Sequence, residues 1–293
     1  MEHWHAWRGD GLVGGHSLLD WIATVHLKMG RMLVAFFRRH AEPHETVSYS
    51  GGVAQNVVWN AMLRQHFPNL VVPPHACDEG LSLGGIEWLR RLHDLPAFTL
   101  PGFPFAQSDT AVPPPSDATV AAAADLLAAG KVVGKVVGWY HGHGEIGPRA
   151  LGNRSILMDP RLADGKERLN AVKQRENYRP FGASVLREHH AGHFDGAPDA
   201  FMLFSCQVRR PGAFPAITHV DLSCRVQAVQ AASNPAFARL MERFHGLTGC
   251  PVLANTSLNL AGKPIAAAPD HARQLFSESK IDAMVIGDEL LLR

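Results

Sequence analysis

"SDATVAAAADLLAAGKVVGKVVGWYHG", residues 116–142, predicts a helix that leads directly into a strand. Ser116 or Asp117 is a suitable N-cap, the alanine-rich run after it favours a helix, and Gly130 stands near the expected helix end. The residues that follow are rich in valine and aromatic side chains, which favour strands. KVVG occurs twice in succession, too short a repeat for a repeat fold, and we interpret it as an extension of one strand or its lead-in.

The segment before this helix predicts a domain boundary. Six prolines lie between Leu95 and Asp117, so a regular element is not expected there. A chain of 293 residues is also long for a single domain. We expect a first domain at 1–95, a proline-rich linker at 96–116 and a second domain at 117–293.

Both expected domains mix helices and strands. In the first, apolar residues at intervals of three and four predict a helix from His16 to Arg39. A short strand at 47–49, a glycine turn and a helix at 55–66 follow, and residues 69–92 repeat the order of strand, loop and helix.

The second domain continues in the same way after its first strand. The remaining predicted elements are a polar helix in 163–178 ended by Arg179-Pro180, a buried strand in 200–208, a strand at 224–229, a capped helix in 234–249, a strand and turn in 250–257, a helix in 268–279 and a strand at 283–287. The fold class is therefore mixed α/β or α+β.

Composition and charge favour a small-molecule partner. The net charge is +1, which argues against broad nucleic-acid binding. Between Arg149 and Arg187, however, nine Lys or Arg stand against four acids, about +5 in a chain that sums to +1. This patch suits a small polyanion such as a nucleotide or a phosphate, and a solvated basic face is the alternative.

The cysteines and the N-terminus predict a cytoplasmic, unexported protein. Four cysteines occur without CxxC spacing, so neither a zinc module nor a disulfide framework is indicated. No apolar run reaches the length of a membrane span, and the N-terminus lacks the pattern of a signal peptide.

Two short motifs in the first domain could bind ligands. SGGVAQN, residues 50–56, stands where a strand gives way to a helix, so its backbone N–H groups could contact a nucleotide, although a plain tight turn is the alternative. Asp78 could ligate a metal or a substrate, or cap the next helix, and taken alone the cap is the stronger interpretation.

Basic residues of the second domain could bind anions. Arg149 and Arg154 are expected on a loop, where a guanidinium can bind phosphate or carboxylate in bidentate fashion, and Glu145 could hold one of them. Lys173 and Arg175 stand at a predicted helix end, which the helix dipole also favours for purely structural reasons.

Several polar sets are less specific. His219, Asp221 and Arg225 form one, and "ANTSLNLAGKP" supplies Asn255, Thr256, Ser257 and Asn259 after an apolar strand, where such residues usually form only a turn. The pairs His141/His143 and His189/His193 lack the further ligands that a metal site requires.

Six motifs in order resemble the NodU-type O-carbamoyltransferases of nodulation and antibiotic tailoring. They are SGGVAQN, GEIGPRALGNRSILMDPR, KQRENYRPFGASVL, THVDLSCRVQ, TGCPVLANTSLNLAGKPI and DAMVIGD. The resemblance runs from about Val47 to the C-terminus. It implies an actin-like ATPase-fold domain, of which this chain holds the second half, followed by a YrdC-like domain.

The resemblance also implies a reaction and its cofactors. The YrdC-like domain would make carbamoyl-adenylate from carbamoyl phosphate and ATP, with Mg²⁺, and the actin-like domain would pass the carbamoyl group to an acceptor hydroxyl. Fe²⁺ would bind in the actin-like domain once the missing N-terminal half is supplied.

The resemblance also implies roles for individual residues of this chain that match the motifs of the family. The KxR and SxN motifs of YrdC-like proteins correspond to Lys173-Gln174-Arg175 and Ser257-Leu258-Asn259. The resemblance implies catalytic roles for Lys173, Arg175 and Arg149. It implies nucleotide or carbamoyl binding by Arg154, Arg179, Arg225, Ser257, Asn259, Glu145, Gly51, Gly52 and Asn56, and metal binding by Asp78.

The chain departs from the family pattern at several positions. The first half of the actin-like domain, with its HxxxH metal pair, is missing. His143 stands where an arginine is usual, Leu222-Ser223 replaces Gly-Thr, and Lys263 replaces an acid.

The sequence therefore leaves three hypotheses about the function open. The chain is a carbamoyltransferase or its C-terminal portion, a degenerate non-catalytic nucleotide-binding protein, or a subunit that needs a separately encoded N-terminal half. Self-association into a homo-oligomer is also expected, because the helix at 16–39 has an apolar face that the missing half could cover.

Overall fold

The computed structural model describes residues 17–106, 111–129 and 134–293. The expected end of the 117–130 helix at Gly130 and most of the first KVVG copy lie outside these residues. The class is mixed α/β, as the sequence predicts, with one eight-stranded sheet among the described residues.

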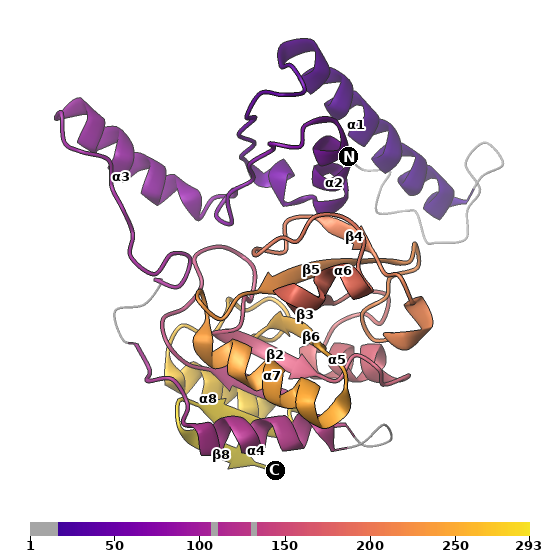
Figure 1. Ribbon diagram of the computed structural model, residues 1–293, viewed down its shortest axis with the longest axis vertical. Coiled ribbons are helices and arrows are strands. Elements are labelled where there is room, and N and C mark those ends of the chain that lie inside the picture. Colours follow the sequence, from indigo (N-terminus) through magenta and orange to yellow (C-terminus); the bar gives the residue numbers. More distant parts are fainter. Residues whose placement is uncertain (1–16, 107–110, 130–133) are drawn as a thin grey trace, which may run out of the picture.

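The N-terminal elements lie above the sheet, where α1 and α2 form a small helical body while α3 projects away to one side (Figure 1). They are α1 (Leu18–His40), the 3-10 helix η1 (Gly52–Gln55), α2 (Val57–His66) and α3 (Gly80–Leu92). The helix predicted at 16–39 is confirmed by α1, and the helix predicted at 55–66 is confirmed by α2. The strands predicted at 47–49 and in 69–92 are reduced to a single parallel bridge between Ser48 and Val71.

Residues 117–293 form the sheet and the helices that cover it. Their elements are α4 (Asp117–Ala128), β1 (Val137–Tyr140), β2 (Arg154–Met158), α5 (Gly165–Lys173), β3 (Gly182–Leu186), η2 (Arg187–His189), α6 (His190–His193), β4 (Ser205–Gln207), η3 (Pro211–Ala213), β5 (Ser223–Val229), α7 (Pro235–Thr248), β6 (Val252–Ser257), α8 (Pro269–Glu278), β7 (Ala283–Ile286) and β8 (Glu289–Leu292). Ser116 caps α4 through its side chain, and Asn234 caps α7 in the same way.

The strand order is β4-β5-β3-β6-β2-β1-β7-β8. Two pairs, β1/β7 and β3/β5, are parallel, and the other pairs are antiparallel. β6 therefore lies between β3 and β2 in the middle of the sheet. At its C-terminal end, Ser257 pairs with Ser155 of β2, whereas pairing with β3 ends at Asn255. The ladder with β2 thus gives the loop that follows a fixed starting point.

Two apolar clusters stabilise these parts. The larger one fills the sheet and its helices and includes Trp139, Phe237 and Phe244, and the smaller one joins α1 and α2 to Leu203 and Phe204. Asn60 links the parts, because its fully buried Nδ2 donates to the carbonyls of Ala54 at 2.7 Å and Leu203 at 2.9 Å. The described part of 96–116 contains no helix or ladder of strands, and a domain boundary there stays a prediction.

Some sequence predictions about elements are wrong. The helix predicted in 163–178 ends at Lys173, because Gln174 adopts a left-handed backbone with φ +52°. The buried strand predicted in 200–208 is the three-residue edge strand β4, which is partly exposed. Sequence reasoning missed β2, β3 and β8.

Across the described residues, no helix is both long and apolar enough to cross a membrane.

Candidate active site

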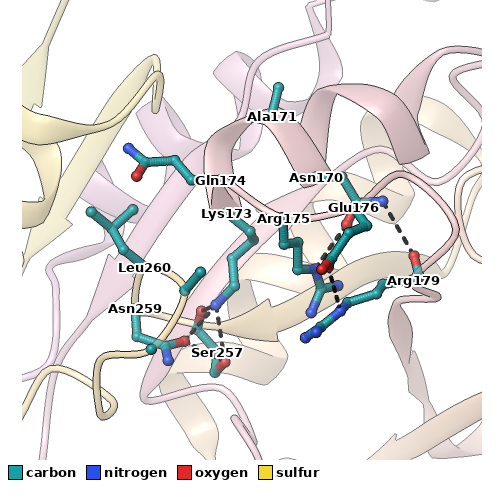
Figure 2. Close-up of a pocket in the computed structure, with 12 residues that line it drawn as sticks. Asn170, Ala171, Lys173, Gln174, Arg175, Glu176, Arg179, Ser257, Asn259 and Leu260 are labelled. Carbon is teal, nitrogen blue, oxygen red and sulfur yellow. Dashed lines mark hydrogen bonds and ion pairs between the residues drawn. The ribbon is translucent and has the colours of Figure 1, made fainter. Parts of the chain in front are cut away.

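A cavity of about 640 Å³ lies between the C-terminal end of α5 and the loop after β6 (Figure 2). This volume is within the range of about 300–1,000 Å³ that small-molecule sites usually have. Two segments line it: Asn170, Ala171, Lys173, Gln174, Arg175, Glu176 and Arg179 from the first, and Ser257, Asn259, Leu260, Ala261 and Gly262 from the second.

The first wall of the cavity exists because α5 stops at Lys173. The backbone N–H of the left-handed Gln174 donates to the carbonyls of Ala171 and Asn170, a cap that turns the chain sharply. The second wall is fastened to this turn, because the Ala261 N–H donates to the Lys173 carbonyl at 3.2 Å.

Lys173 is the most buried cation of the cavity. The side chain is 3% exposed, and its ammonium donates to the Ser257 carbonyl at 2.6 Å, to Ser257 Oγ at 3.1 Å and to Asn259 Oδ1. Burial, and then the charge of Arg175, lowers the pKa of Lys173 to about 7. The structure thus brings together the KxR lysine and the SxN pair, as the sequence predicts.

Arg175 and Arg179 lie at the other end of the same wall. The Arg175 guanidinium lies over the Phe181 ring, 4.4 Å from its centroid. Burial, and then the charges of Arg179 and Arg225, lowers the pKa of Arg175 to about 10. Arg179 forms an ion pair with Glu176 at 2.9 Å in which both side chains are about half exposed, so it is worth little to stability.

Arg225 and Arg149 continue the row of cations toward the N-terminal body. Burial, and then the charge of Arg149, lowers the pKa of Arg225 to about 9. Arg149 Nη2 donates to the carbonyl of Gln55 at 3.2 Å. The Nε atoms of both arginines are buried without a hydrogen-bond partner. Unpaired buried cations are costly, and an anionic ligand would supply the missing partners.

A second cavity of about 590 Å³ lies in the N-terminal body. Gly51, Gly52 and Asp78 all line it, together with His75 and Trp88. Within the described ranges, however, no three His, Cys, Asp or Glu side chains are grouped so that they could hold a metal ion. Asp78 therefore stands without the companion ligands that a metal site in this part of the chain requires.

Comparison with known proteins identifies the family. Residues 124–293, over half of the chain, match the family model described as Carbamoyltransferase C-terminus. The chain belongs to the NodU-type O-carbamoyltransferase family.

The relatives are considerably longer than this chain. The nodulation protein NolO of Bradyrhizobium diazoefficiens is 35% identical over 93% of this chain and 54% of its own length. A 3'-hydroxymethylcephem-O-carbamoyltransferase of Amycolatopsis lactamdurans is 38% identical over 82% of this chain and 47% of its own. The chain thus spans about half the length of the curated relatives it matches.

One solved structure is also similar in part. Full-length HypF, in its phosphate- and nucleotide-bound form, aligns with 59% of this chain and 21% of its own at 15% identity. The TM-score is 0.42, too low to support a conclusion about the fold.

Two residues expected to bind the ligand of this carbamoyltransferase family face the protein interior instead. Arg154 begins β2 rather than lying on a loop, and it is 1% exposed. Its guanidinium donates to the carbonyls of His141, Gly142 and Asn153 and covers the Tyr140 ring. These contacts give Arg154 a structural role.

Glu145 is the second of these residues. Its Oε1 accepts the backbone N–H groups of Leu151 at 2.7 Å, Asn153 at 2.9 Å and Arg154 at 3.2 Å. Burial raises the pKa of this carboxyl group. Glu145 thus fixes the backbone of the 144–153 loop and of Arg154 from the protein interior, and a contact of Glu145 with a ligand stays a prediction.

Asn56 also differs from expectation, because it caps α2. Its Oδ1 accepts the N–H groups of Val58 and Trp59, both at 3.2 Å, and its Nδ2 lies 3.0 Å from His26 Nε2. The side chain therefore makes its hydrogen bonds within the protein, and a contact of Asn56 with a nucleotide stays a prediction.

The structure shows the surroundings of three positions at which the resemblance implied another residue. Leu222 adopts φ +63°, a left-handed conformation that glycine adopts more readily than leucine. Lys263 turns away to pair with Glu278 at 3.5 Å, and its carbonyl accepts from Asn259 Nδ2. The His143 carbonyl accepts from Asn153 Nδ2 at 2.8 Å, inside the same loop as Glu145.

Sequence reasoning missed Asn170, which lines the cavity and is fully buried. Its Oδ1 accepts from Arg175 Nε at 2.8 Å. The available signal was an asparagine in the last turn of a helix, a position it does not favour unless its amide makes hydrogen bonds.

Proposed function

We propose that the protein forms carbamoyl-adenylate from carbamoyl phosphate and ATP and supports transfer of the carbamoyl group to an acceptor hydroxyl. One observation carries the proposal. Three cationic side chains, Lys173, Arg175 and Arg179, line a cavity whose lining includes a single carboxylate, that of Glu176. Arg225 and Arg149 extend this set of cations beyond the cavity lining, and the most buried cation, Lys173, is hydrogen-bonded to the SxN loop. Two phosphorylated substrates bring the negative charge that this set of cations lacks.

The charges suggest how the cations divide between the substrates. Arg149 and Arg225, with buried Nε atoms that lack partners, suit the phosphate and carbonyl oxygens of carbamoyl phosphate. Lys173, Arg175 and Arg179 border the open cavity and suit the triphosphate. Ser257 and Asn259 orient Lys173, so the ammonium is held where negative charge develops during transfer.

The reaction balances with one water molecule. Carbamoyl phosphate, ATP and water give carbamoyl-adenylate, inorganic phosphate and pyrophosphate. Water bonds to the phosphorus of carbamoyl phosphate, the bridging P–O bond breaks, and inorganic phosphate and carbamate form. A carbamate oxygen then bonds to the α phosphorus of ATP, the bond from this phosphorus to the oxygen that bridges to the β phosphate breaks, and pyrophosphate leaves with the electron pair. In the transfer step the acceptor oxygen bonds to the carbamoyl carbon, AMP leaves, and the hydroxyl proton passes to a base.

The arrangement of an actin-like part followed by a YrdC-like part belongs to this proposal, and so does transfer to oxygen. The relative named 3'-hydroxymethylcephem-O-carbamoyltransferase supports an O-acceptor. ATP fits the charge and size of the cavity. The donor sets around Asp78 and Glu176 do not make a metal site from the described residues, so no step is assigned to a protein-bound ion.

The test is carbamoyl-phosphate-dependent exchange of labelled pyrophosphate into ATP. Lys173→Ala should lower the exchange rate by about a hundredfold or more, because removal of a preorganised charged donor has effects of this order. Lys280→Ala is the matched control, since Lys280 is exposed and does not line the cavity. Absence of exchange in the wild-type chain, or an unchanged rate in Lys173→Ala, would contradict the proposal.

A further inference from the structure

Asn170 connects the end of α5 to both arginines of the cavity wall (Figure 2). Its Oδ1 accepts from Arg175 Nε at 2.8 Å. Its Nδ2 donates to the carbonyls of Asn177 at 3.3 Å and Arg179 at 3.2 Å. A single buried amide therefore fixes one guanidinium and the backbone that carries the next.

These contacts act against a repulsion. Arg175 lies within the electrostatic influence of Arg179 and Arg225, and both charges disfavour its own. Besides Asn170, the Arg175 guanidinium contacts the Pro180 carbonyl at 3.3 Å and the face of Phe181. Glu176 attracts Arg175 but is itself paired with Arg179. Without a tether, a long side chain in this position gains entropy and loses repulsion by turning toward solvent.

The amide is the side chain that this position requires. One oxygen accepts and one nitrogen offers two donors, so a primary amide can bond a guanidinium on one side and two carbonyls on the other. Aspartate would face the two carbonyls with an oxygen, and alanine would leave both sides without a partner. Asparagine is also unfavourable in a helix, so its presence in α5 points to these hydrogen bonds rather than to helix stability.

We propose that Asn170 is a positioning residue for anion binding: it holds Arg175 and the 177–179 segment so that two mutually repelling guanidiniums face the same cavity. The inference rests on the proposed function, which supplies the polyanionic ligand. It assigns Asn170 no contact with the reacting atoms.

The test is a double-mutant cycle on the full chain, with inorganic pyrophosphate as the calorimetric probe. Asn170→Ala and Arg175→Ala should each raise the dissociation constant for pyrophosphate about tenfold. The dissociation constant of the double variant should exceed that of either single variant by at most about twofold, because Asn170 acts on the anion through Arg175. Asn177→Ala is the control, since Asn177 is exposed and contributes only a carbonyl that the substitution retains.

Thermal unfolding of every variant separates positioning from folding. Should Asn170→Ala not fold, Asn170→Ser replaces it, since its shorter hydroxyl removes the bond to Arg175 with a smaller change in polarity. Additive losses in the cycle, or an unchanged affinity in a folded Asn170 variant, would overturn the inference alone. A wild-type chain that binds no pyrophosphate would overturn both the inference and the anion site, and binding without exchange would overturn only the proposed function.

Discussion

At the scale of single residues, position in the fold separates cations that look alike in the sequence. Arg149 and Arg154 stand five positions apart, and the Nε atom of each is buried without a hydrogen-bond partner. The Nη atoms differ, because those of Arg154 donate to the carbonyls of His141, Gly142 and Asn153, whereas Arg149 donates to the carbonyl of Gln55 in the N-terminal body. The difference arises because Arg154 is the first residue of a central strand and points inward. Sequence patterns report the residue type but not this orientation.

Lys173 should make anion binding depend on pH near neutrality. Its pKa in the free protein is lowered to about 7, so the ammonium loses its proton as the pH rises through that value. An anion binds the charged form, and the affinity for pyrophosphate should therefore fall above pH 7 by up to about tenfold per pH unit. Calorimetry from pH 6 to 9 measures this dependence.

Lys173→Arg is the comparison for this experiment, because a guanidinium stays charged over the whole range. The ratio of wild-type to variant affinity cancels the titration of pyrophosphate itself. A ratio that stays constant from pH 6 to 9 would mean that Lys173 does not titrate there.

At the scale of elements, the sequence predicted the main helices and the strands β1, β5, β6 and β7, but it missed β2, β3 and β8. α1, α4 and α7 follow from apolar period and caps. β2 was hidden because its five residues are all buried between two neighbours, and β3 likewise shows no alternation. The left-handed Gln174, which creates the cavity wall, has no signal in residue type, so the helix was extended too far.

The candidate site divides in the same way. Motif resemblance predicted that Lys173, Ser257 and Asn259 would meet, and they do. It could not show that Glu145 and Asn56 are occupied by backbone N–H groups, because capping and loop-shaping contacts depend on where the chain turns.

The 144–153 loop depends on a glycine that no other residue can replace easily. Gly152 has φ +108°, and a Cβ there would overlap the ring of Phe237 in α7. Gly152→Ala should lower the free energy of unfolding by about 2 kcal/mol or more, from backbone strain and overpacking together. Urea unfolding measures the change.

Gly246, in the same helix α7, provides a control of opposite sign. It is exposed, and a Cβ there would meet no atom within 4 Å. Gly246→Ala should raise the free energy of unfolding by about 0.5–1 kcal/mol, because alanine favours a helix interior. Equal effects of the two substitutions would show that the Phe237 contact does not constrain the loop.

At the scale of the whole molecule, the two apolar clusters differ in how completely they are covered. The sheet is enclosed by its helices, whereas the N-terminal body leaves large apolar side chains in contact with solvent. On α1 these include Leu19, Met32 and Phe36, which are 76%, 62% and 56% exposed. An apolar surface of this kind marks an interaction site in soluble proteins.

The helix α3 is the most exposed element of the N-terminal part. Among its 13 residues none is buried, and Leu81, Trp88, Leu89 and Leu92 are 57–73% exposed. In Figure 1 the helix extends away from the rest of the molecule. A helix of this length is marginal in water without packing, so α3 should gain stability when its apolar face is covered.

We expect this chain on its own to self-associate through that face as concentration rises. Light scattering should show a growing mass for the wild type and a smaller one for Leu89→Glu/Leu92→Glu, while Leu247→Glu, which charges an exposed position on α7, should leave self-association unchanged. A wild-type chain that stays a monodisperse monomer at high concentration would mean that the exposed leucines of α3 do not drive association.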